Sequence, residues 1–139
     1  MDNQFQAFDS RCKFGGKYFP SPIFTASGCA GSGKELSQFF DLDELGAVVT
    51  KSISVKPRSG RATPRMAETP SGMLNSIGLQ GPGIDQFLAE DIPWLIANNA
   101  RVIVSISGET IEEYASLARK LRGVAGISGI EVNISCPNV

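Results

Sequence analysis

Residues 102–133, VIVSISGETIEEYASLARKLRGVAGISGIEVN, decide the fold because they contain a complete strand–helix–strand unit. The runs at 102–106 and 130–133 are almost continuously apolar, which is typical of parallel strands covered on both faces. Residues 110–122 between them have the spacing of an amphipathic helix, and Thr110 with Glu113 predicts a capping box at its start. A right-handed crossover of this kind indicates an α/β fold.

The same alternation extends toward the N-terminus. Short apolar runs at 23–26 and 47–50 predict two earlier strands, which gives four strands in all. Helical spacing is present at 34–45 and 84–97, and Pro93 must kink or divide the second of these helices. On the helix at 110–122, the predicted buried face consists of Ile111, Tyr114, Ala115, Ala118 and Leu121.

Two parts of the chain fall outside this alternation. Residues 1–20 are expected to form a tail and a β-hairpin around Gly15-Gly16. Residues 53–82 are rich in Ser, Pro, Gly and Arg, so a long loop is expected there. A loop of that length inside a compact domain usually has a function.

Composition narrows the class of protein. A chain of 139 residues has the length of one domain, and its 42% hydrophobic and 19% charged residues are ordinary for a globular protein. A net charge of −1 gives no indication of binding to nucleic acid or to a membrane surface. No apolar run has the length of a membrane span, and the first residues do not resemble a signal peptide.

Cysteine and histidine usage limits the chemistry. The three cysteines form no C-x-x-C pair, which favours a reducing, cytoplasmic location. Because the chain contains no histidine, metal sites and Ser-His or Cys-His nucleophiles are disfavoured. An acid or base that works near neutral pH must then be a cysteine, a lysine or a perturbed carboxylate.

Small or polar residues follow every predicted strand. They are Ser27 and Gly28 after the first strand, Lys51 and Ser52 after the second, Ser105 in the third, and Asn133 with Cys136 after the fourth. A single lysine after a buried strand usually only reaches solvent. In parallel α/β folds, however, ligands bind at this edge of the sheet, so the coincidence at all four strands predicts a ligand site.

Other motifs leave alternatives open. Gly28 to Lys34 fits the first seven positions of a P-loop, but Glu35 stands where Ser or Thr would bind magnesium, so a Gly-rich turn is favoured over a nucleotide site. Cys29 is expected to be a small buried filler. Trp94 and Tyr114 are expected to be packing residues. The arginines of the long loop could contact phosphate, but such residues more often form a solvated face or anchor an interface; they are Arg58, Arg61 and Arg65.

Four segments together resemble the N-terminal half of class 1 dihydroorotate dehydrogenase, the flavin enzyme of pyrimidine biosynthesis. They are Ala26-Ser27-Gly28, Thr50-Lys51-Ser52, Asn75-Ser76-Ile77-Gly78-Leu79 and Asn133-Ile134-Ser135-Cys136-Pro137-Asn138, and they occur in the family's order. The similarity extends from about Tyr18 to the last residue, and the last segment is the most specific. Residues 67–75 are more similar to subclass 1B, which passes electrons to NAD through an iron–sulfur flavoprotein partner. Ser105 replaces an expected Asn and is more similar to subclass 1A, so NAD and fumarate both stay open as final acceptors.

The resemblance implies a (β/α)8 TIM barrel that holds FMN, with residues 1–139 as the N-terminal half of that single domain and 53–82 as a substrate loop. The implied FMN contacts are Ser27, Lys51, Ser52, Ser105 and Asn133. The implied contacts with dihydroorotate or orotate are Lys51, Asn75, Ser76, Ile77, Gly78, Leu79, Asn133 and Asn138. Cys136 is implied as the general base that removes the C5 proton, while the hydride leaves C6 for the flavin.

A (β/α)8 barrel needs eight strands, and this sequence supplies four. We therefore expect a fragment or one part of a larger assembly, which as a lone chain binds FMN weakly or not at all. The resemblance implies a homodimer in the full-length protein and an iron–sulfur/FAD electron-transfer subunit as a partner. The alternative from another class is a non-catalytic half-barrel that serves as an interaction module.

Overall fold

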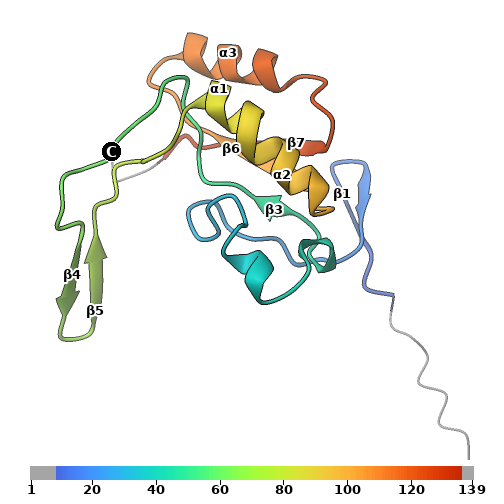
Figure 1. Cartoon of the computed structure of the whole chain (residues 1–139), viewed down its shortest axis with the longest axis horizontal. Helices are drawn as coiled ribbons and strands as arrows, with labels where there is room; N and C mark the ends of the chain where they lie inside the picture. Colours follow the sequence, from blue (N-terminus) through green and yellow to red (C-terminus); the bar gives the residue numbers. More distant parts are fainter. Residues whose placement is uncertain (1–8, 136–139) are drawn as a thin grey trace, which may run out of the picture.

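A three-stranded parallel sheet forms the centre of the fold (Figure 1). The computed structural model describes residues 9–135. The sheet has the order β3 (Val48–Val49), β6 (Val102–Ile106), β7 (Ile127–Val132). β6 pairs with both neighbours, Val48 lying opposite Val102 and Val132 opposite Ile106. The predicted strand–helix–strand unit is confirmed, although β7 begins three residues before the predicted run at 130–133.

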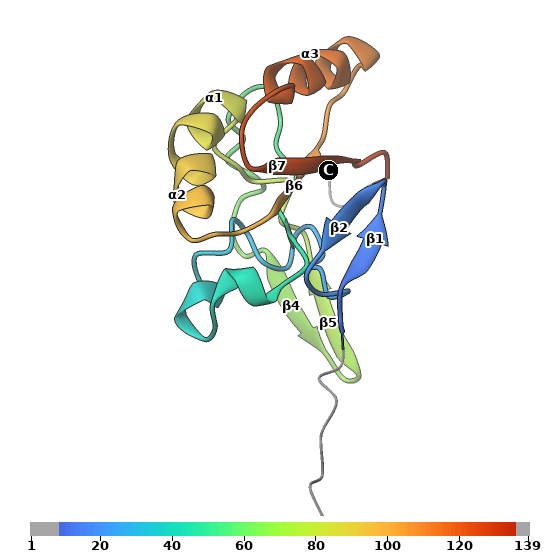
Figure 2. The ribbon, with the colours of Figure 1, turned by 90° about the vertical axis from the view of Figure 1, so that its right-hand side faces the viewer.

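The predicted N-terminal hairpin is also confirmed. β1 (Cys12–Phe14) and β2 (Lys17–Phe19) pair in antiparallel fashion around the Gly15-Gly16 turn. The hairpin lies on the side of the sheet opposite the helices (Figure 2). Between hairpin and sheet is an apolar cavity of about 410 Å³, and Phe14, Val49, Ile103 and Ile130 are among the residues that line it.

The prediction of a strand at 23–26 is wrong, because Phe24 forms only a single parallel bridge with Ala47. The hydroxyl of Thr25 explains the interruption. It accepts a hydrogen bond from the Val49 N–H (2.8 Å) and donates one to the Val49 carbonyl (3.1 Å). One side chain thus satisfies both backbone groups that a regular ladder would pair with main chain. The described residues therefore contain three parallel strands and one bridge in place of the four expected strands.

The helix predicted at 34–45 is also wrong. The segment contains two short 3₁₀ turns, η1 (Leu36–Gln38) and η2 (Leu42–Glu44). Asp41 between them has an extended backbone (φ −72°, ψ 131°), which a continuous helix does not allow. Phe39, one of the apolar residues that give this segment its helical spacing, is 81% exposed.

The interruption predicted at Pro93 is confirmed. The helical segment consists of α1 (Ile84–Gln86), the π-helical turn η3 (Phe87–Asp91) and α2 (Ile92–Ala97). Pro93 has no N–H to donate and its ring crowds the carbonyl four residues earlier, so the wider π turn precedes it. Within residues 9–135, no helix combines the length and apolar character needed to cross a membrane.

α3 (Ile111–Leu121) begins at the predicted cap. The Thr110 hydroxyl accepts from the Glu113 N–H, while the Glu113 carboxylate accepts from the N–H of Glu109 and not of Thr110. The predicted buried face is partly wrong, because Ile111 is 82% exposed. The helix instead packs through Tyr114, Leu117 and Leu121.

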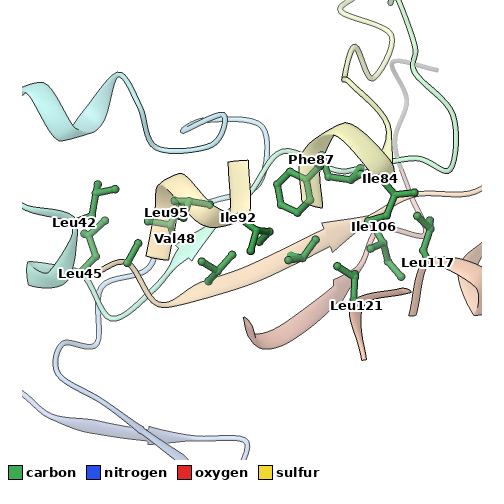
Figure 3. Packing of buried hydrophobic residues seen from close by; sticks show 14 residues of the cluster. Leu42, Leu45, Val48, Ile84, Phe87, Ile92, Leu95, Ile106, Leu117 and Leu121 are labelled. Atoms are coloured by element: carbon green, nitrogen blue, oxygen red, sulfur yellow. The ribbon is translucent and has the colours of Figure 1, made fainter. Parts of the chain in front are cut away.

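The hydrophobic core lies between the sheet and the helices (Figure 3). Alternate residues of the central strand, Val102, Val104 and Ile106, face it, as expected for one side of a pleated strand. The α1–α2 segment and α3 supply the opposing side chains; they are Ile84, Phe87, Ile92, Leu95, Leu117 and Leu121. Ile103 and Ser105 consequently face the other side of the sheet, toward the hairpin and the strand ends.

The long segment at 53–82 is not structureless. It contains a second hairpin, β4 (Met66–Thr69) and β5 (Gly72–Asn75), where only a long loop was expected. This hairpin projects from the rest of the molecule, and both of its strands are exposed (Figure 1). Arg65 fixes its base by donating to the carbonyls of Arg61 (2.5 Å) and Ser59 (2.8 Å).

The Thr25 hydroxyl is open to a direct test. Thr25→Val keeps the shape of the side chain but leaves the Val49 N–H without its partner, so the free energy of unfolding should fall by about 1–3 kcal/mol. Urea unfolding followed by circular dichroism measures this change. Thr69→Val on the exposed β4 strand is the matched control and should change stability by less than about 0.5 kcal/mol. Equal stability of the two variants would contradict the assignment.

Candidate functional site

Residues from four separate segments line one cavity of about 240 Å³ at the carboxyl ends of the strands. Ser27 comes from the segment after the Phe24 bridge, Lys51 and Ser52 come from the segment after β3, and Asn133 follows β7. The 75–79 segment closes the cavity with Asn75, Ile77, Gly78 and Leu79. The predicted convergence of these segments at one edge of the sheet is therefore present in the structure.

An irregularity in the sheet directs Lys51 and Ser52 to this cavity. Val49 pairs with Ile103, and the next pair is Ile53 with Ile106. Three residues therefore lie between the paired positions on the first chain segment, but only two lie between them on β6. The extra residue is a β-bulge, which re-aims the side chains around it. The Lys51 N–H donates outside the strand ladder, to the Gly31 carbonyl (2.9 Å) in the neighbouring loop.

A buried polar network lies beneath the cavity. The Asn133 side-chain amide donates to Ser52 Oγ (2.9 Å), and Ser52 Oγ lies 2.9 Å from Ser105 Oγ. Thr50 Oγ1 accepts from the Ser105 N–H (3.3 Å), so the bulged strand and β6 are joined by side chains where the ladder is interrupted. Because buried polar groups are costly unless paired, this network fixes the geometry of the strand ends.

Lys51 is the charged residue in the lining of this cavity. It is half-buried, and among residues 9–135 its ammonium group forms no ion pair. Gly28 packs beside it, since a Cβ on Gly28 would lie 3.9 Å from Lys51 Nζ. A half-buried cation among neutral hydroxyls and amides favours an anionic or electron-rich group of a ligand.

The 75–79 segment has a constrained backbone at the cavity. Gly78 has φ +77° and the non-glycine Leu79 has φ +50°, a conformation that L-residues rarely adopt. Leu79 is nevertheless buried, so packing holds it there. Gly78 lies against Arg61, whose N–H donates to the Ile77 carbonyl (3.0 Å), and a Cβ at Gly78 would lie only 2.8 Å from that nitrogen.

Two predicted site residues do not line the cavity. Ser105 is completely buried, and its hydroxyl lies behind Ser52. Ser76 donates its N–H to the Arg65 carbonyl (2.8 Å) at the base of the second hairpin. Cys136 and Asn138 lie outside the described residues, so the structure does not place the predicted base.

The lysine of the P-loop-like sequence has another role. Lys34 Nζ donates to the Asp91 carboxylate (2.8 Å) and lies 5.8 Å from the centre of the Trp94 ring. The hydrogen bond to Asp91 raises the pKa of Lys34 above its usual value. This ammonium group therefore fastens the 28–34 turn to the α1–α2 segment, whereas a P-loop lysine must face a phosphate. The structure gives no support to the P-loop interpretation.

Cys29 was expected to be buried, but it is exposed and lines the cavity beside Gly28. Its position two residues after Ser27 is the signal that could have placed it there. The arginines of the long loop are partly accounted for by contacts inside the protein. Arg58 pairs with Glu109 (2.9 Å), and Arg65 binds Gln80 and two main-chain carbonyls.

A second, larger cavity of about 650 Å³ adjoins the first and shares Lys51 and Ile77 with it. Arg58, Phe87 and Asp91 are among its other lining residues. The two cavities together have the size of a pocket for a small molecule or a cofactor ring. Lys51, in the wall between them, is accessible from both.

The donor set suits a flavin ring better than a metal ion. Hydroxyls of Ser27 and Ser52, the Lys51 ammonium and the Asn133 amide are hydrogen-bonding groups that match the polar edge of an isoalloxazine. Among the described residues, no group of three or more His, Cys, Asp or Glu side chains is placed to hold a metal ion.

Comparison with known proteins gives a consistent result. A family model described as dihydroorotate dehydrogenase matches residues 10–139. The chain is 52% identical, over 86% of its length, to the dihydroorotate dehydrogenase B (NAD(+)) catalytic subunit of Geotalea uraniireducens, of which it covers 39%. It is 50% identical, over 90% of its length, to the protein of the same description from Thermoanaerobacter sp. strain X514, of which it covers 41%. The chain thus spans about two fifths of these relatives.

A solved structure has the same fold. The crystal structure of DHODH from Eimeria tenella in complex with ferulenol matches with a TM-score of 0.70, at 18% identity. The match covers 94% of this chain and 38% of that one.

Gly78 offers a test of the constrained loop. Gly78→Ala places a Cβ at a positive φ and also against the Arg61 backbone, so the free energy of unfolding should fall by about 2–4 kcal/mol. Gly123→Ala is the matched control, because Gly123 has φ +75° with nothing within 4 Å of an added Cβ. The control should lose only about 1 kcal/mol, the cost of the backbone conformation. Thermal or urea unfolding compares them, and equal losses would show that the close approach to Arg61 has no energetic weight.

Proposed function

The chain belongs to the dihydroorotate dehydrogenase family, and from this premise we propose that its strand-end site takes part in the FMN-dependent oxidation of dihydroorotate to orotate. One observation carries the proposal. Ser27, Lys51, Ser52, Asn133 and the 75–79 segment, which are distant in sequence, line a single cavity. This is the arrangement that a planar, polar, anionic substrate and a flavin would require at one edge of a parallel sheet.

Each lining residue has a role that follows from its chemistry. Lys51 pairs with a negative group of the substrate or the flavin, since its ammonium is half-buried and forms no ion pair within residues 9–135. The Asn133 amide donates one N–H to Ser52 Oγ, and its oxygen accepts a long bond from the Ser135 N–H (3.4 Å), so its second N–H and second lone pair remain for a ligand. The 75–79 segment would bind the substrate through Asn75, Ile77, Gly78 and Leu79, which line the cavity, and Asn138 would add an amide.

Cys136 is proposed as the general base that removes the C5 proton of dihydroorotate. A cysteine with an ordinary pKa of about 8.5 is mostly protonated at neutral pH, so it needs a nearby cation or hydrogen-bond donor to act as a base. Lys51 is the cation of the cavity. FMN, when bound, supplies the acceptor for the hydride that leaves C6. Ser27, Lys51, Ser52 and Asn133 would hold the flavin ring. Ser105 would affect it indirectly, through its hydrogen bond with the Ser52 hydroxyl.

The wider setting of the enzyme is part of the same proposal. The names of the relatives support subclass 1B, in which an iron–sulfur/FAD electron-transfer subunit passes electrons to NAD. The complete fold would be a (β/α)8 barrel, and the protein would be a cytoplasmic homodimer. β7 is an edge of the sheet, and its exposed Ile130 and Val132 lie opposite the helix-facing Val104 and Ile106, which is consistent with further strands and helices completing a barrel at this edge.

Replacement of Cys136 tests the proposed base. In the native protein, Cys136→Ala should lower the turnover of dihydroorotate by about 100- to 10,000-fold, the usual contribution of a positioned base, while flavin stays bound. Flavin absorbance and anaerobic reduction by dihydroorotate measure binding and turnover separately. Cys12→Ala, in the N-terminal hairpin, is the control and should keep full activity. Undiminished turnover by Cys136→Ala near neutral pH would remove Cys136 from this role.

Replacement of Lys51 tests the anion contact. Lys51→Met keeps the aliphatic chain but removes the charge, so kcat/KM for dihydroorotate should fall by about 10- to 100-fold, as expected for one charged hydrogen bond. Lys17→Met on the exposed β2 strand is a control for the change in net charge and should have little effect. Equal kinetics of the two variants would show that Lys51 contacts neither substrate nor flavin.

A further inference from the structure

We infer that Tyr114, on the outer helix α3, is a positioning residue for the strand-end site, because its hydroxyl fixes the main chain at Asn133 from behind the sheet. The inference rests on the proposed oxidation of dihydroorotate. Tyr114 does not line the cavity, so its effect is exerted through Asn133.

The contact is a hydrogen bond from Tyr114 Oη to the Asn133 carbonyl oxygen (2.5 Å). Asn133 is the first residue after β7, and its N–H donates to the carbonyl of Ile106 at the end of β6 (3.0 Å). Both backbone polar groups of Asn133 are therefore held, one by the sheet and one by the helix.

The sheet does not supply the second of these bonds. β6 ends at Ile106, and within residues 9–135 the Gly108 N–H, which would make the next bond of a continued parallel ladder, does not donate to Asn133. The Asn133 carbonyl is thus left without its continuing partner at the point where the parallel ladder ends. The Tyr114 hydroxyl takes that place.

The position of Asn133 determines the direction of its side chain. The Asn133 amide donates to Ser52 Oγ, which lies 2.9 Å from Ser105 Oγ. The Ser52 hydroxyl therefore links the ends of β6 and β7 to the segment that follows β3. In the sequence, Cys136 follows three residues later. A shift of the main chain at Asn133 would move the amide in the cavity and the start of the segment that carries the proposed base.

The ring of Tyr114 explains why the hydroxyl has a separate role. Its ring packs against the hydrophobic core beside Leu117 and Leu121, which phenylalanine would do equally well. The oxygen atom is therefore not needed for packing, and its function is the bond to Asn133. Displacements of about 1 Å at a reacting group can lower rates as much as 100-fold, so one such bond has a measurable effect on turnover.

Tyr114→Phe in the native, flavin-loaded protein tests the inference. We expect kcat per bound flavin to fall about tenfold, with KM for dihydroorotate changed less than threefold and with flavin content retained. Hydrogen–deuterium exchange should become faster for peptides that include residues 132–135, and should be unchanged in β6. Tyr18→Phe is the matched control, because Tyr18 is 73% exposed on the N-terminal hairpin; it should leave kinetics and exchange unaltered.

The possible outcomes separate this inference from the proposed function. If the unaltered protein fails to oxidise dihydroorotate, the proposed function is wrong, and faster exchange at 132–135 in Tyr114→Phe would still support the fixing of Asn133. If Tyr114→Phe loses thermal stability or flavin but keeps kcat per bound flavin and normal exchange at 132–135, Tyr114 is only a packing residue. Failure of the variant to yield flavin-loaded protein would equally overturn a role confined to positioning.

Discussion

β6 is paired on both of its edges, and the whole arrangement of the site depends on that constraint. Its parallel ladders to β3 and β7 fix the relative heights of three strand ends. Because Val102, Val104 and Ile106 face the helices, Ile103 and Ser105 must face the other side. The hydrophobic core and the polar network thus lie on opposite faces of the same strand, so a shift of β6 would displace both.

The site is formed where this regular pairing fails. The extra residue between Val49 and Ile53 releases Lys51 and Ser52 from the ladder, and Thr25 replaces main-chain pairing with its hydroxyl at the neighbouring segment. Each irregularity is compensated by side-chain hydrogen bonds, and no buried side-chain nitrogen or oxygen is left without a partner in the described part of the chain. Polar side chains can therefore reach a cavity at the end of an otherwise apolar sheet without a large loss of stability.

Sequence patterns predicted the elements with strong local signals and failed where local signals compete with packing. The strand–helix–strand unit was predictable because β6, α3 and β7 each have one clear periodicity, with a cap at Thr110. The segment 34–45 has helical spacing, but its tertiary contacts bury Leu42 and leave Phe39 exposed, so two short turns form instead. The second hairpin gives only a weak signal, since both of its strands are exposed and lack alternation between apolar and polar residues.

The sequence by itself determined the parallel α/β class, the chemical types at the strand ends, and the resemblance to a flavin enzyme family. These depend on periodicity and on short motifs, which are local properties of the chain. Only the tertiary structure decided that Ser105 lies behind Ser52, that Cys29 faces the cavity, that Lys34 is bound to Asp91, and that Tyr114 holds Asn133. The physical reason is that these positions depend on strand register and helix packing. Both bring together residues that are far apart in the sequence, so a local sequence pattern cannot predict them.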